Sequence, residues 1–254
     1  IRRVGGNIMV KRGLQLLYAV LILHILWALG AWVVDRPLLP TPWAVYMYFP
    51  HLLNMDLWWN IYLSLYRLAM SLVFATLIGV PLGIMSVCLP KFGALFEPLV
   101  YFTYPIPKIA LLPVIMLLAG LGNASKIITI TLIIVFQIII GVRDAVKQIP
   151  PTMYQVLDVL AADRWQTFVN VTGPASLAGF FSALKIALGT AIATLFFTEM
   201  YGTQYGMGYY IMDQWNRLDY LAMFGGIIVI SVVSFLLFLT ISGLERYCLR
   251  WQNK

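Results

Sequence analysis

Few ionisable side chains interrupt the long apolar stretches of this chain, and each is a candidate for transport chemistry or for structural pairing. His24, Arg67, Lys108 and Lys185 lie clearly within these stretches, and no Asp or Glu does. Lys108 and Lys185 suggest a pathway that attracts an anion; the alternatives are snorkelling or pairing for Lys108 and an interhelical contact for Lys185. For His24, a satisfied contact between helices is favoured over a proton relay.

Arg67 stands near the outer end of a predicted span, on a helix face that it shares with Ser64 and Ser71. Its side chain is long enough to carry the guanidinium to the membrane surface while the stem stays in apolar surroundings. Snorkelling to the interface is therefore the favoured interpretation of this residue.

Residue patterns that support enzyme catalysis are missing from the sequence. It contains no G-x-x-x-x-G-K-[ST] phosphate loop, no H-E-x-x-H motif and no Cys/His cluster. The two histidines, His24 and His51, do not support a Ser-His-acid triad, and Cys88 and Cys248 indicate neither a disulfide framework nor a metal site. We expect no enzyme activity, no cofactor in this chain and no role with nucleic acid.

The composition identifies the environment in which these residues lie. Of 254 residues, 61% are hydrophobic and 11% charged, against about 45–50% and about 25% in soluble domains. A helix needs about 20 apolar residues to cross the hydrocarbon core. The chain is thus predicted to be an all-α integral membrane protein with six transmembrane helices, at roughly 14–34, 62–87, 95–119, 124–142, 175–198 and 223–243.

Two of these apolar runs need comment. The third contains Pro105, Pro107 and Pro113, which free backbone carbonyls and place this span inside the bundle or beside a cavity. The first is too long for the apolar region of a cleavable signal peptide, so no such peptide is expected.

The distribution of Lys and Arg sets the predicted orientation, because these residues favour the cytoplasmic side. With the N-terminus inside, the three that fall in outside segments are Arg36, Lys126 and Arg217. The eleven that fall in inside segments are Arg2, Arg3, Lys11, Arg12, Lys91, Arg143, Lys147, Arg164, Arg246, Arg250 and Lys254. This asymmetry predicts an N-in, C-in topology and a cytoplasmic location for the segment 143–174.

A polar, helix-patterned segment, residues 149–179, breaks the apolar sequence on that side. Asp163 and Gln166 have the spacing of a capping box, in which the Asp side chain accepts from backbone N–H groups and the Gln reaches back. The pattern predicts two short helices with a break near 161–162. The second is expected to end near 172–174, where the next span begins.

Apolar side chains recur at helical spacing in this segment and form one face: Leu157, Leu160, Ala161, Trp165 and Phe168. A short helix on the membrane surface cannot bury such a face alone, so the face must dock on a partner or on lipid. The alternative is an ordinary amphipathic loop helix.

The segment resembles the cytoplasmic loop of the membrane subunits of binding-protein-dependent ABC importers, whose helix inserts into a cleft of the ATPase subunit. That loop has the form E-A-A-x-x-x-G, followed by a hydrophobic-x-Leu-Pro. The Glu, Ala, Ala, Gly, Leu and Pro of this pattern fall on Gln155, Val156, Leu157, Ala161, Gly173 and Pro174. The family's common G-A-S-R-W-Q run corresponds to residues 161–166, with Asp163 in the place of Ser. The departures at Gln155 and Ala161 imply coupling through shape and Arg164 rather than through a glutamate.

Other stretches resemble the nitrate/sulfonate/taurine branch of these permeases, in the family's order and spacing over roughly residues 38–251. They are LPTP (39–42), SLYRLAMSLVFATLIGVPLGIM (64–85), YPIPKIALLPVIMLLAGLGNASKI (104–127), TEMYGTQYGMGYYI (198–211) and LERYCLRW (244–251). The resemblance implies the type I importer permease fold in the bacterial cytoplasmic (inner) membrane. It implies a five-helix core at 61–254 with a coupling loop at 149–174, preceded in 1–60 by an N-terminal segment, a first transmembrane helix and an outer loop.

The same resemblance marks candidate residues of the translocation pathway or its gate. The family often has Lys at the place of Lys108, beside Pro107, which favours a structural or gating role. Glu199 matches the Glu that opens the family's E-x-x-x-x-x-x-G-x-G segment, which continues to Gly206 and Gly208. We expect an outer gate region there, with Glu199 as a hinge anchor or as a contact for the binding protein. Lys185 completes this candidate set.

The favoured function is that of an ABC importer permease, which moves a small anionic solute of the nitrate, sulfonate or taurine type inward by alternating access. Expected partners are a second permease (a second copy or a close relative), two ATPase subunits that hold ATP and Mg²⁺, an extracytoplasmic substrate-binding protein, and membrane lipid. Coupling to the ATPase is assigned to Gln155, Leu157, Asp158, Leu160, Ala161, Asp163, Arg164 and Trp165. The alternative is a stand-alone secondary transporter or channel.

Overall fold

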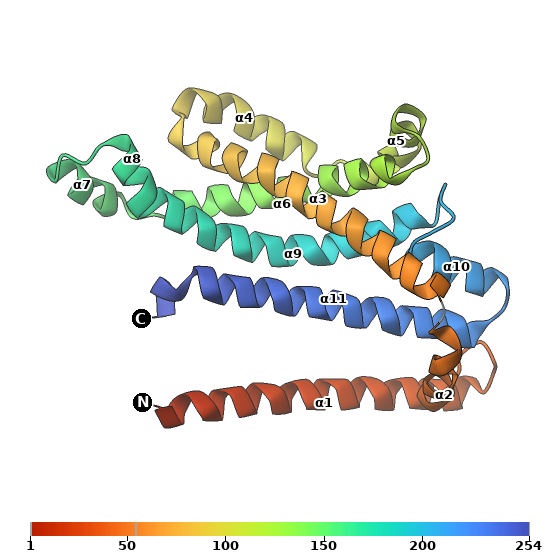
Figure 1. Ribbon diagram of the computed structural model, residues 1–254. Coiled ribbons are helices and arrows are strands. Elements are labelled where there is room, and N and C mark those ends of the chain that lie inside the picture. Colours follow the sequence, from red (N-terminus) through yellow and green to blue (C-terminus); the bar gives the residue numbers. More distant parts are fainter. Residues whose placement is uncertain (1, 54, 254) are drawn as a thin grey trace. The chain divides into compact units, whose positions relative to one another are not determined.

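Helices make up every regular element in the part of the chain that the computed structural model describes, residues 2–53 and 55–253 (Figure 1). The α-helices are α1 (Arg2–Val34), α2 (Pro42–Leu52), α3 (Met55–Cys88), α4 (Pro90–Thr103), α5 (Leu112–Ala119), α6 (Asn123–Lys147), α7 (Pro151–Val159), α8 (Arg164–Thr167), α9 (Gly173–Glu199), α10 (Met207–Asn216) and α11 (Tyr220–Cys248). Two short 3-10 helices, η1 (Lys108–Leu111) and η3 (Arg250–Asn253), and one π turn, η2 (Phe168–Thr172), complete the described elements. The predicted all-α class is confirmed.

Five helical runs are long and apolar enough to cross a membrane: Leu17–Val34, Asp56–Cys88, Asn123–Lys147, Arg164–Glu199 and Tyr220–Cys248. A sixth crossing results if Pro90–Thr103 and Lys108–Ala119, which are bent by 83°, count as one broken span. The break falls where the sequence places Pro105 and Pro107, because proline cannot donate to the helical ladder. The described residues thus agree with six predicted spans, the third of them interrupted.

The helices extend beyond the apolar stretches from which the spans were predicted. Five acidic side chains lie on membrane-crossing helical runs: Asp56, Glu97, Asp144, Glu199 and Glu245. The expectation that no Asp or Glu lies in the spans was therefore wrong. Glu97 falls within the predicted span 95–119 itself. The other four lie just beyond the predicted spans, because backbone hydrogen bonding continues a helix into the interfacial layers, where polar side chains are tolerated.

The chain divides into two compact units. The first comprises Ile1–Trp58 and Tyr210–Val229, and the second comprises Trp59–Tyr209 and Ile230–Lys254. Each boundary falls within or next to a helix, so α3, α10 and α11 contribute residues to both units.

In the first unit, polar contacts join α1 to α2 and to the loop between them. The Trp27 indole N–H donates to the Pro40 carbonyl at 2.9 Å, and the His24 ring makes a hydrogen bond with the Tyr46 hydroxyl. Thr41 caps the N-terminus of α2 with its side chain. His24 therefore has the satisfied contact between helices that the sequence favoured.

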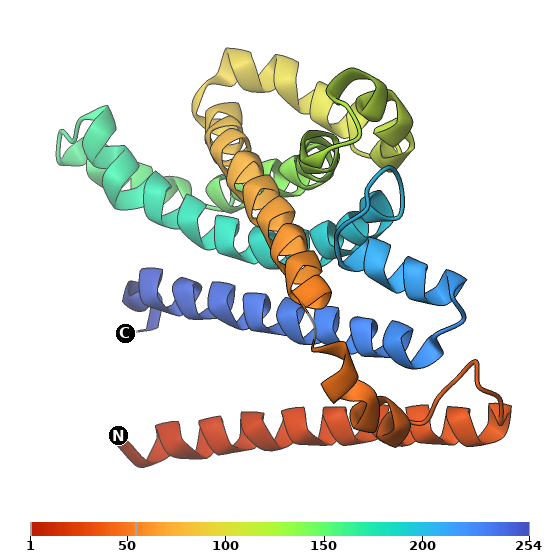
Figure 2. The same cartoon turned by 45° about the vertical axis from the view of Figure 1, so that its right-hand side comes forward.

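The second unit contains the antiparallel pair α6 and α9, which lie side by side in both views of the chain (Figures 1 and 2). Small residues allow this close approach: a Cβ on Gly141 would overlap Ala183, and a Cβ on Gly179 would lie 2.8 Å from the Gly141 carbonyl oxygen. Buried aliphatic side chains such as Ile138 and Leu188 fill the seam beside these glycines.

The α6–α9 pair has different structures at its two ends. Figures 1 and 2 place α7, α8 and the C-terminal end of α11 at one end, and residues 200–206, which we call the α9–α10 turn, at the other. Helix α9 has 27 residues and so extends about 40 Å, at about 1.5 Å per residue. It connects the two regions that contain most of the predicted functional residues.

Candidate functional site

The predicted coupling residues lie between α6 and α9, in a segment that we call the connector, residues 151–168. Helix α7 ends at Val159 and α8 begins at Arg164, which confirms the predicted break. Asp163 Oδ1 accepts from the Gln166 N–H at 2.7 Å, and Gln166 Oε1 accepts from the Asp163 N–H at 3.0 Å. The predicted capping box is formed, and it fixes the start of α8.

Ala161 closes α7 in the left-handed region of backbone conformation, at φ 51°. Its N–H donates to the Asp158 carbonyl, and the Ala162 N–H donates to the Leu157 carbonyl, both at 3.0 Å. Such a helix end usually carries glycine, because the left-handed conformation costs about 1–2 kcal/mol when a Cβ is present. This conformation explains why a glycine suits position 161 and marks Ala161 as a strained occupant.

The helix that begins at α8 continues through η2 into α9, which corrects the expected end near Thr172-Gly173-Pro174. In the π turn the Gly173 N–H donates to the Phe168 carbonyl, five residues earlier in the chain. The wider turn accommodates Pro174, which has no N–H to donate. The Tyr154 and Thr172 hydroxyls lie 3.3 Å apart and link α7 to this turn. The connector is therefore continuous with a membrane-crossing helix.

Large apolar side chains of the connector are exposed in this chain. Val159 is 86% exposed, Leu160 70% and Trp165 70%, and the Trp165 ring stacks on Phe168 with centroids 5.8 Å apart. Among the predicted coupling residues Leu157 is half-buried, and the exposed ones are Gln155, Asp158, Leu160, Ala161, Asp163, Arg164 and Trp165. Exposed apolar side chains on a capped segment are typical of an interaction surface, and we call Val159, Leu160, Trp165 and Phe168 the connector surface.

At the opposite end of α9, the Glu199 carboxylate is fully buried in a network of charge-assisted hydrogen bonds. It accepts from Arg67 Nη1 at 2.7 Å, from the Ser64 hydroxyl at 2.8 and 2.9 Å, and from the Gly208 N–H at 3.0 Å. The network joins α3, α9 and the start of α10. Glu199 has no exposed surface in this chain, a geometry that favours the anchor among its two predicted roles.

Arg67 is 2% exposed, so the favoured interpretation that it snorkels to the membrane interface was wrong. Besides Glu199, its guanidinium donates to Asn123 Oδ1 at 2.8 Å, the Tyr205 carbonyl at 2.9 Å and Thr203 Oγ1 at 3.3 Å. These partners compensate the guanidinium for the water that it loses on burial.

A sequence signal for this network existed. The polar residues of α3 recur at helical spacing through an apolar span, at Asn60, Ser64, Arg67 and Ser71. Three of them were recognised as one face, but Asn60 was not, and no local pattern identifies Glu199 as their partner because it lies far away in the sequence.

The two glycines after Glu199 permit a very close backbone approach. Gly206 has φ 122°, and a Cβ there would overlap the Glu199 carboxylate. A Cβ on Gly208 would lie 2.6 Å from the Phe196 carbonyl oxygen. The Gly206 N–H instead donates to Asn60 Oδ1 at 2.6 Å, within the same network. The predicted roles of these glycines, a tight turn and close approach, are physically accounted for.

Lys126 adds a second buried cation near this network and was missed by the sequence analysis, which assigned it to an outside loop. It is fully buried near the N-terminus of α6. Its ammonium donates to the Leu121 carbonyl at 2.7 Å and to the Gly202 carbonyl at 3.0 Å, which fixes the α9–α10 turn against α6. The long sequence separation of Gly202 explains why no local signal identified the contact.

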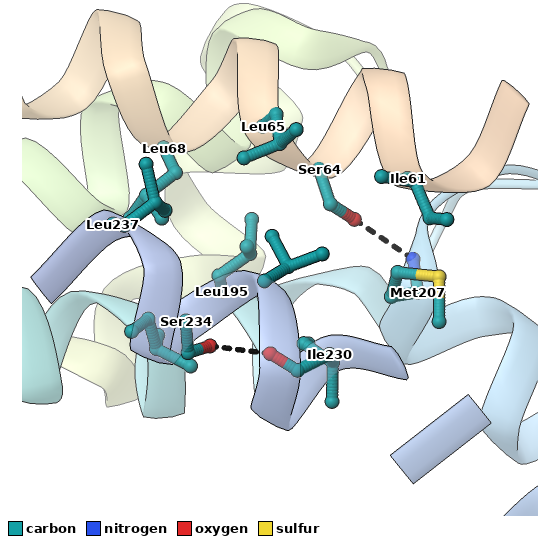
Figure 3. Close-up of a pocket in the computed structure, with 11 residues that line it drawn as sticks. Ile61, Ser64, Leu65, Leu68, Leu195, Met207, Ile230, Ser234 and Leu237 are labelled. Atoms are coloured by element: carbon teal, nitrogen blue, oxygen red, sulfur yellow. Dashed lines mark hydrogen bonds between the residues drawn. The ribbon is translucent and has the colours of Figure 1, made fainter. Parts of the chain in front are cut away.

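A small enclosed cavity lies beside this network, between α3, α9, α11 and the start of α10 (Figure 3). The Ser64 hydroxyl, which accepts from the Met207 N–H at 2.8 Å, is one of its few polar groups, and apolar side chains such as Leu65 and Leu195 form most of the wall. Its volume of about 20 Å³ accommodates no more than a water molecule. It is too small for an organic solute.

Lys108, a predicted pathway residue, caps the broken span. Its buried ammonium donates to the Thr103 carbonyl at 2.8 Å and the Tyr104 carbonyl at 3.0 Å, and it lies 4.4 Å from the centre of the Phe136 ring. These contacts occupy the C-terminal carbonyls of α4, which the break at Pro107 leaves without helical partners. The geometry favours the structural role considered for this lysine.

Lys185, the other predicted pathway lysine, joins α9 to α11. Its ammonium lies 2.9 Å from both carboxylate oxygens of Glu245, and both side chains are largely buried. Of its two interpretations, the interhelical contact describes this geometry. Both lysines that suggested an anion pathway are therefore neutralised or capped by other protein groups.

These features describe a membrane protein with several spans. At one end of α9 a buried ion pair anchors the turn to α10, and at the other end lies a capped connector with exposed apolar side chains. A family model described as "Binding-protein-dependent transport system inner membrane component" matches residues 75–251. The chain belongs to this family. It is a multi-pass inner membrane permease of an ABC importer, a kind of permease that works with a binding protein and with separate subunits that hydrolyse ATP.

Similar permeases carry the names of several small solutes. The taurine transport system permease protein TauC of Escherichia coli (strain K12) is 28% identical over 202 residues, 80% of this chain and 74% of that protein. The putative aliphatic sulfonates transport permease protein SsuC of Bacillus subtilis (strain 168) is 29% identical over 225 residues, 88% and 82% of the two chains. The bicarbonate transport system permease protein CmpB of Synechococcus elongatus (strain ATCC 33912 / PCC 7942 / FACHB-805) is 27% identical over 199 residues, 78% and 72%.

Solved structures confirm the predicted fold. A chain of the MetNI methionine ABC transporter, in an inward-facing conformation, matches 74% of this chain and 94% of its own length with a TM-score of 0.64 and 21% identity. A bacterial ABC transporter involved in alginate import matches 92% of this chain and 96% of its own with a TM-score of 0.60 and 19% identity. The architecture is that of type I ABC importer permeases.

Proposed function

We propose that this permease imports a small solute of the sulfonate and taurine type by alternating access, with the connector surface docked on a partner ATPase. The observation that carries the proposal is the exposure of Val159, Leu160 and Trp165 on a segment whose backbone is fixed by a capping box. A rigid apolar surface outside the hydrocarbon core needs a partner, and an ATPase subunit supplies one.

Helix α9 offers a direct route for the coupling. The connector continues through η2 into α9, and the far end of α9 is tied to α3 and to the α9–α10 turn through Glu199. A displacement at the connector therefore moves one rigid element that reaches the turn. The coupling requires that the two states of the ATPase bind the connector with different affinity, since equal affinity shifts no equilibrium.

We also propose the full assembly that the sequence suggests: a second permease, either another copy or a close relative, two ATPase subunits and an extracytoplasmic binding protein. Support comes from the family to which the chain belongs, whose permeases work with ATPase subunits and binding proteins.

The solute class is supported by the relatives and not by the lysines. Taurine and aliphatic sulfonates are named for two permeases that are 28% and 29% identical to this chain. The prediction of an anionic solute was based on Lys108 and Lys185, whose ammonium groups are held by carbonyls and by Glu245. The sulfonate and taurine class remains the proposal, without those lysines as its basis.

The coupling assignment is tested by combining Arg164→Glu with Trp165→Ala in the complete importer. Both side chains are exposed, so the variant permease is expected to accumulate normally in the membrane while ATPase co-purification and solute uptake are lost. The matched control combines Arg217→Glu with Trp215→Ala, an exposed pair outside the connector, which should leave ATPase co-purification unchanged. Normal assembly and uptake in the connector variant would sink the assignment.

A further inference from the structure

Two neighbouring cavities on the second unit share lining residues. The first, of about 480 Å³, lies between α6 and α9, and its polar lining residues are Tyr104, Gln137, Asp144, Gln148 and Ser182. The second, of about 420 Å³, lies between the broken span, α6 and α9, and its polar lining residues are Tyr104, Lys108, Gln137, Thr190 and Thr194. Tyr104 and Gln137 line both cavities, so the two are neighbours, and together we call them the furrow.

The furrow covers much of the thickness of a membrane. On α6 its lining runs from Ile133 to Gln148, a rise of about 22 Å, and on α9 from Ala178 to Phe197, about 28 Å. The hydrocarbon core is about 30 Å thick. Polar residues within such a core face the bundle or a water-filled cavity, so polar side chains spaced along a largely apolar furrow of this length are compatible with a pathway.

The charges along the furrow are already compensated. Lys108 and Asp144 are the charged residues in its described lining. The Lys108 ammonium donates to the Thr103 and Tyr104 carbonyls, and the Asp144 carboxylate lies 2.6 Å from Arg143 Nη2. What remains free to interact with a solute is neutral: carboxamides and hydroxyls.

Gln137 and Thr190 lie at the junction of the two cavities. The Gln137 Nε2 donates to Thr190 Oγ1 at 3.0 Å, which links α6 to α9. The Gln137 Oε1 is buried, and no described protein group makes a hydrogen bond with it. Either orientation of the carboxamide leaves one polar atom unsatisfied. Its terminal torsion is soft, so a rotation turns this atom toward the furrow.

We propose that the furrow is this chain's share of the solute pathway and that Gln137 with Thr190 forms its mid-membrane contact with the solute. The contact takes a small polar solute without net charge, such as a zwitterion with a sulfonate or carboxylate group, through hydrogen bonds. A net charge without a counter-charge is costly to desolvate, whereas the two charges of a zwitterion compensate each other. The inference rests on the proposed function, because it assumes that the chain is the solute-conducting subunit.

The test uses single cysteines in the complete importer. Exposed Cys88 and Cys248 are first replaced by serine, and Thr190→Cys is then compared with Ile134→Cys, at a fully buried position, and Ile128→Cys, at an exposed position beside an apolar cavity. Labelling is followed with an anionic sulfonatoethyl and a cationic trimethylammonioethyl methanethiosulfonate, which react with ionised thiols in water.

Thr190→Cys is expected to react with both reagents, with rates that differ by less than about tenfold, because charged clefts concentrate ions by 10–10³-fold and a neutral one does not. The cysteines at 128 and 134 should react far more slowly. A Thr190→Cys as unreactive as the buried control overturns the furrow as an aqueous pathway. A strong preference for the anionic reagent overturns its neutral character.

Gln137→Glu, added to Thr190→Cys, tests the contact itself at mildly alkaline pH. A carboxylate at the junction should shift the labelling preference at Thr190→Cys toward the cationic reagent by about tenfold or more. An unchanged preference means that residue 137 does not face the furrow. ATPase co-purification from the same preparations separates the two proposals: its loss contradicts the proposed function, whereas unreactive cysteine in an intact assembly contradicts the furrow alone.

Discussion

The candidate functional residues at the two ends of α9 differ in burial: those at one end are buried and hydrogen-bonded, and those at the other are mostly exposed. Around Glu199, two buried cations and a carboxylate are held by hydroxyl, carbonyl and N–H groups of the same chain. At the connector, Leu160 and Trp165 are 70% exposed, and no comparable set of contacts holds them. The first region is satisfied within the chain, whereas the second leaves large apolar side chains exposed, and we propose that a partner covers them.

The contrast indicates how α9 can transmit a displacement from the connector to the α9–α10 turn. The end at Glu199 resists change, because breaking a buried ion pair leaves an uncompensated charge. The connector end is rigid in its backbone but unsatisfied on its surface, so it can gain a large interaction energy from one state of a partner.

Removing one member of the buried ion pair should have the largest effect. Glu199→Leu leaves Arg67 buried without its carboxylate and is expected to lower the stability of the purified permease by about 3–5 kcal/mol. Thermal unfolding in detergent measures this loss. The double variant Arg67→Met with Glu199→Leu buries neither charge and should recover a large part of it. A double variant as unstable as the single one would show that the pair's charge is not what matters.

At the connector, a charge on the apolar surface should disrupt assembly without disturbing the fold. Leu160→Asp is expected to weaken ATPase binding by about 2 kcal/mol or more, the scale of an interface hot spot, while the thermal midpoint of the isolated permease stays unchanged. The control is Leu218→Asp, at an exposed position outside the connector (68% against 70%). Equal ATPase binding by the two variants would remove the connector from the interface.

A backbone change can probe the same buried network without touching a charge. Gly206→Ala places a Cβ on the Glu199 carboxylate at φ 122° and should cost about 1–3 kcal/mol of stability. Gly189→Ala is the matched control, because a Cβ there meets nothing within 4 Å and lies in a helix, where alanine is favoured. Thermal unfolding of both variants checks the difference. Similar stability would mean that the turn relaxes freely.

The smallest expected effect is a gain at the connector. Ala161→Gly relieves the left-handed strain at φ 51° and should stabilise the connector by about 1 kcal/mol. Ala162→Gly is the control, because its backbone is not left-handed and glycine gains nothing there. Hydrogen exchange of the α7 and α8 amides measures the effect. Slower exchange in both variants alike would rule out the strain explanation.

Much of the architecture could be predicted because it depends on local patterns. Apolar run length located the spans, and the clustered prolines placed the break near Pro107. The Asp163–Gln166 spacing gave the capping box, whose two hydrogen bonds join residues three apart. The end expected near Pro174 was wrong because a π turn keeps the helix continuous across a proline, and no residue pattern reports that turn.

The sequence by itself determined the membrane environment, the helices and the position of the connector, since each follows from hydropathy and from contacts between neighbours along the chain. The partners of the charged side chains, in contrast, became visible in the tertiary structure alone. In that structure Arg67 is buried against Glu199, Lys108 caps the C-terminal end of α4, and Lys185 pairs with Glu245. Whether a cation attracts a solute or caps a helix depends on its partners in space. Where those partners are distant in the sequence, no local pattern identifies them.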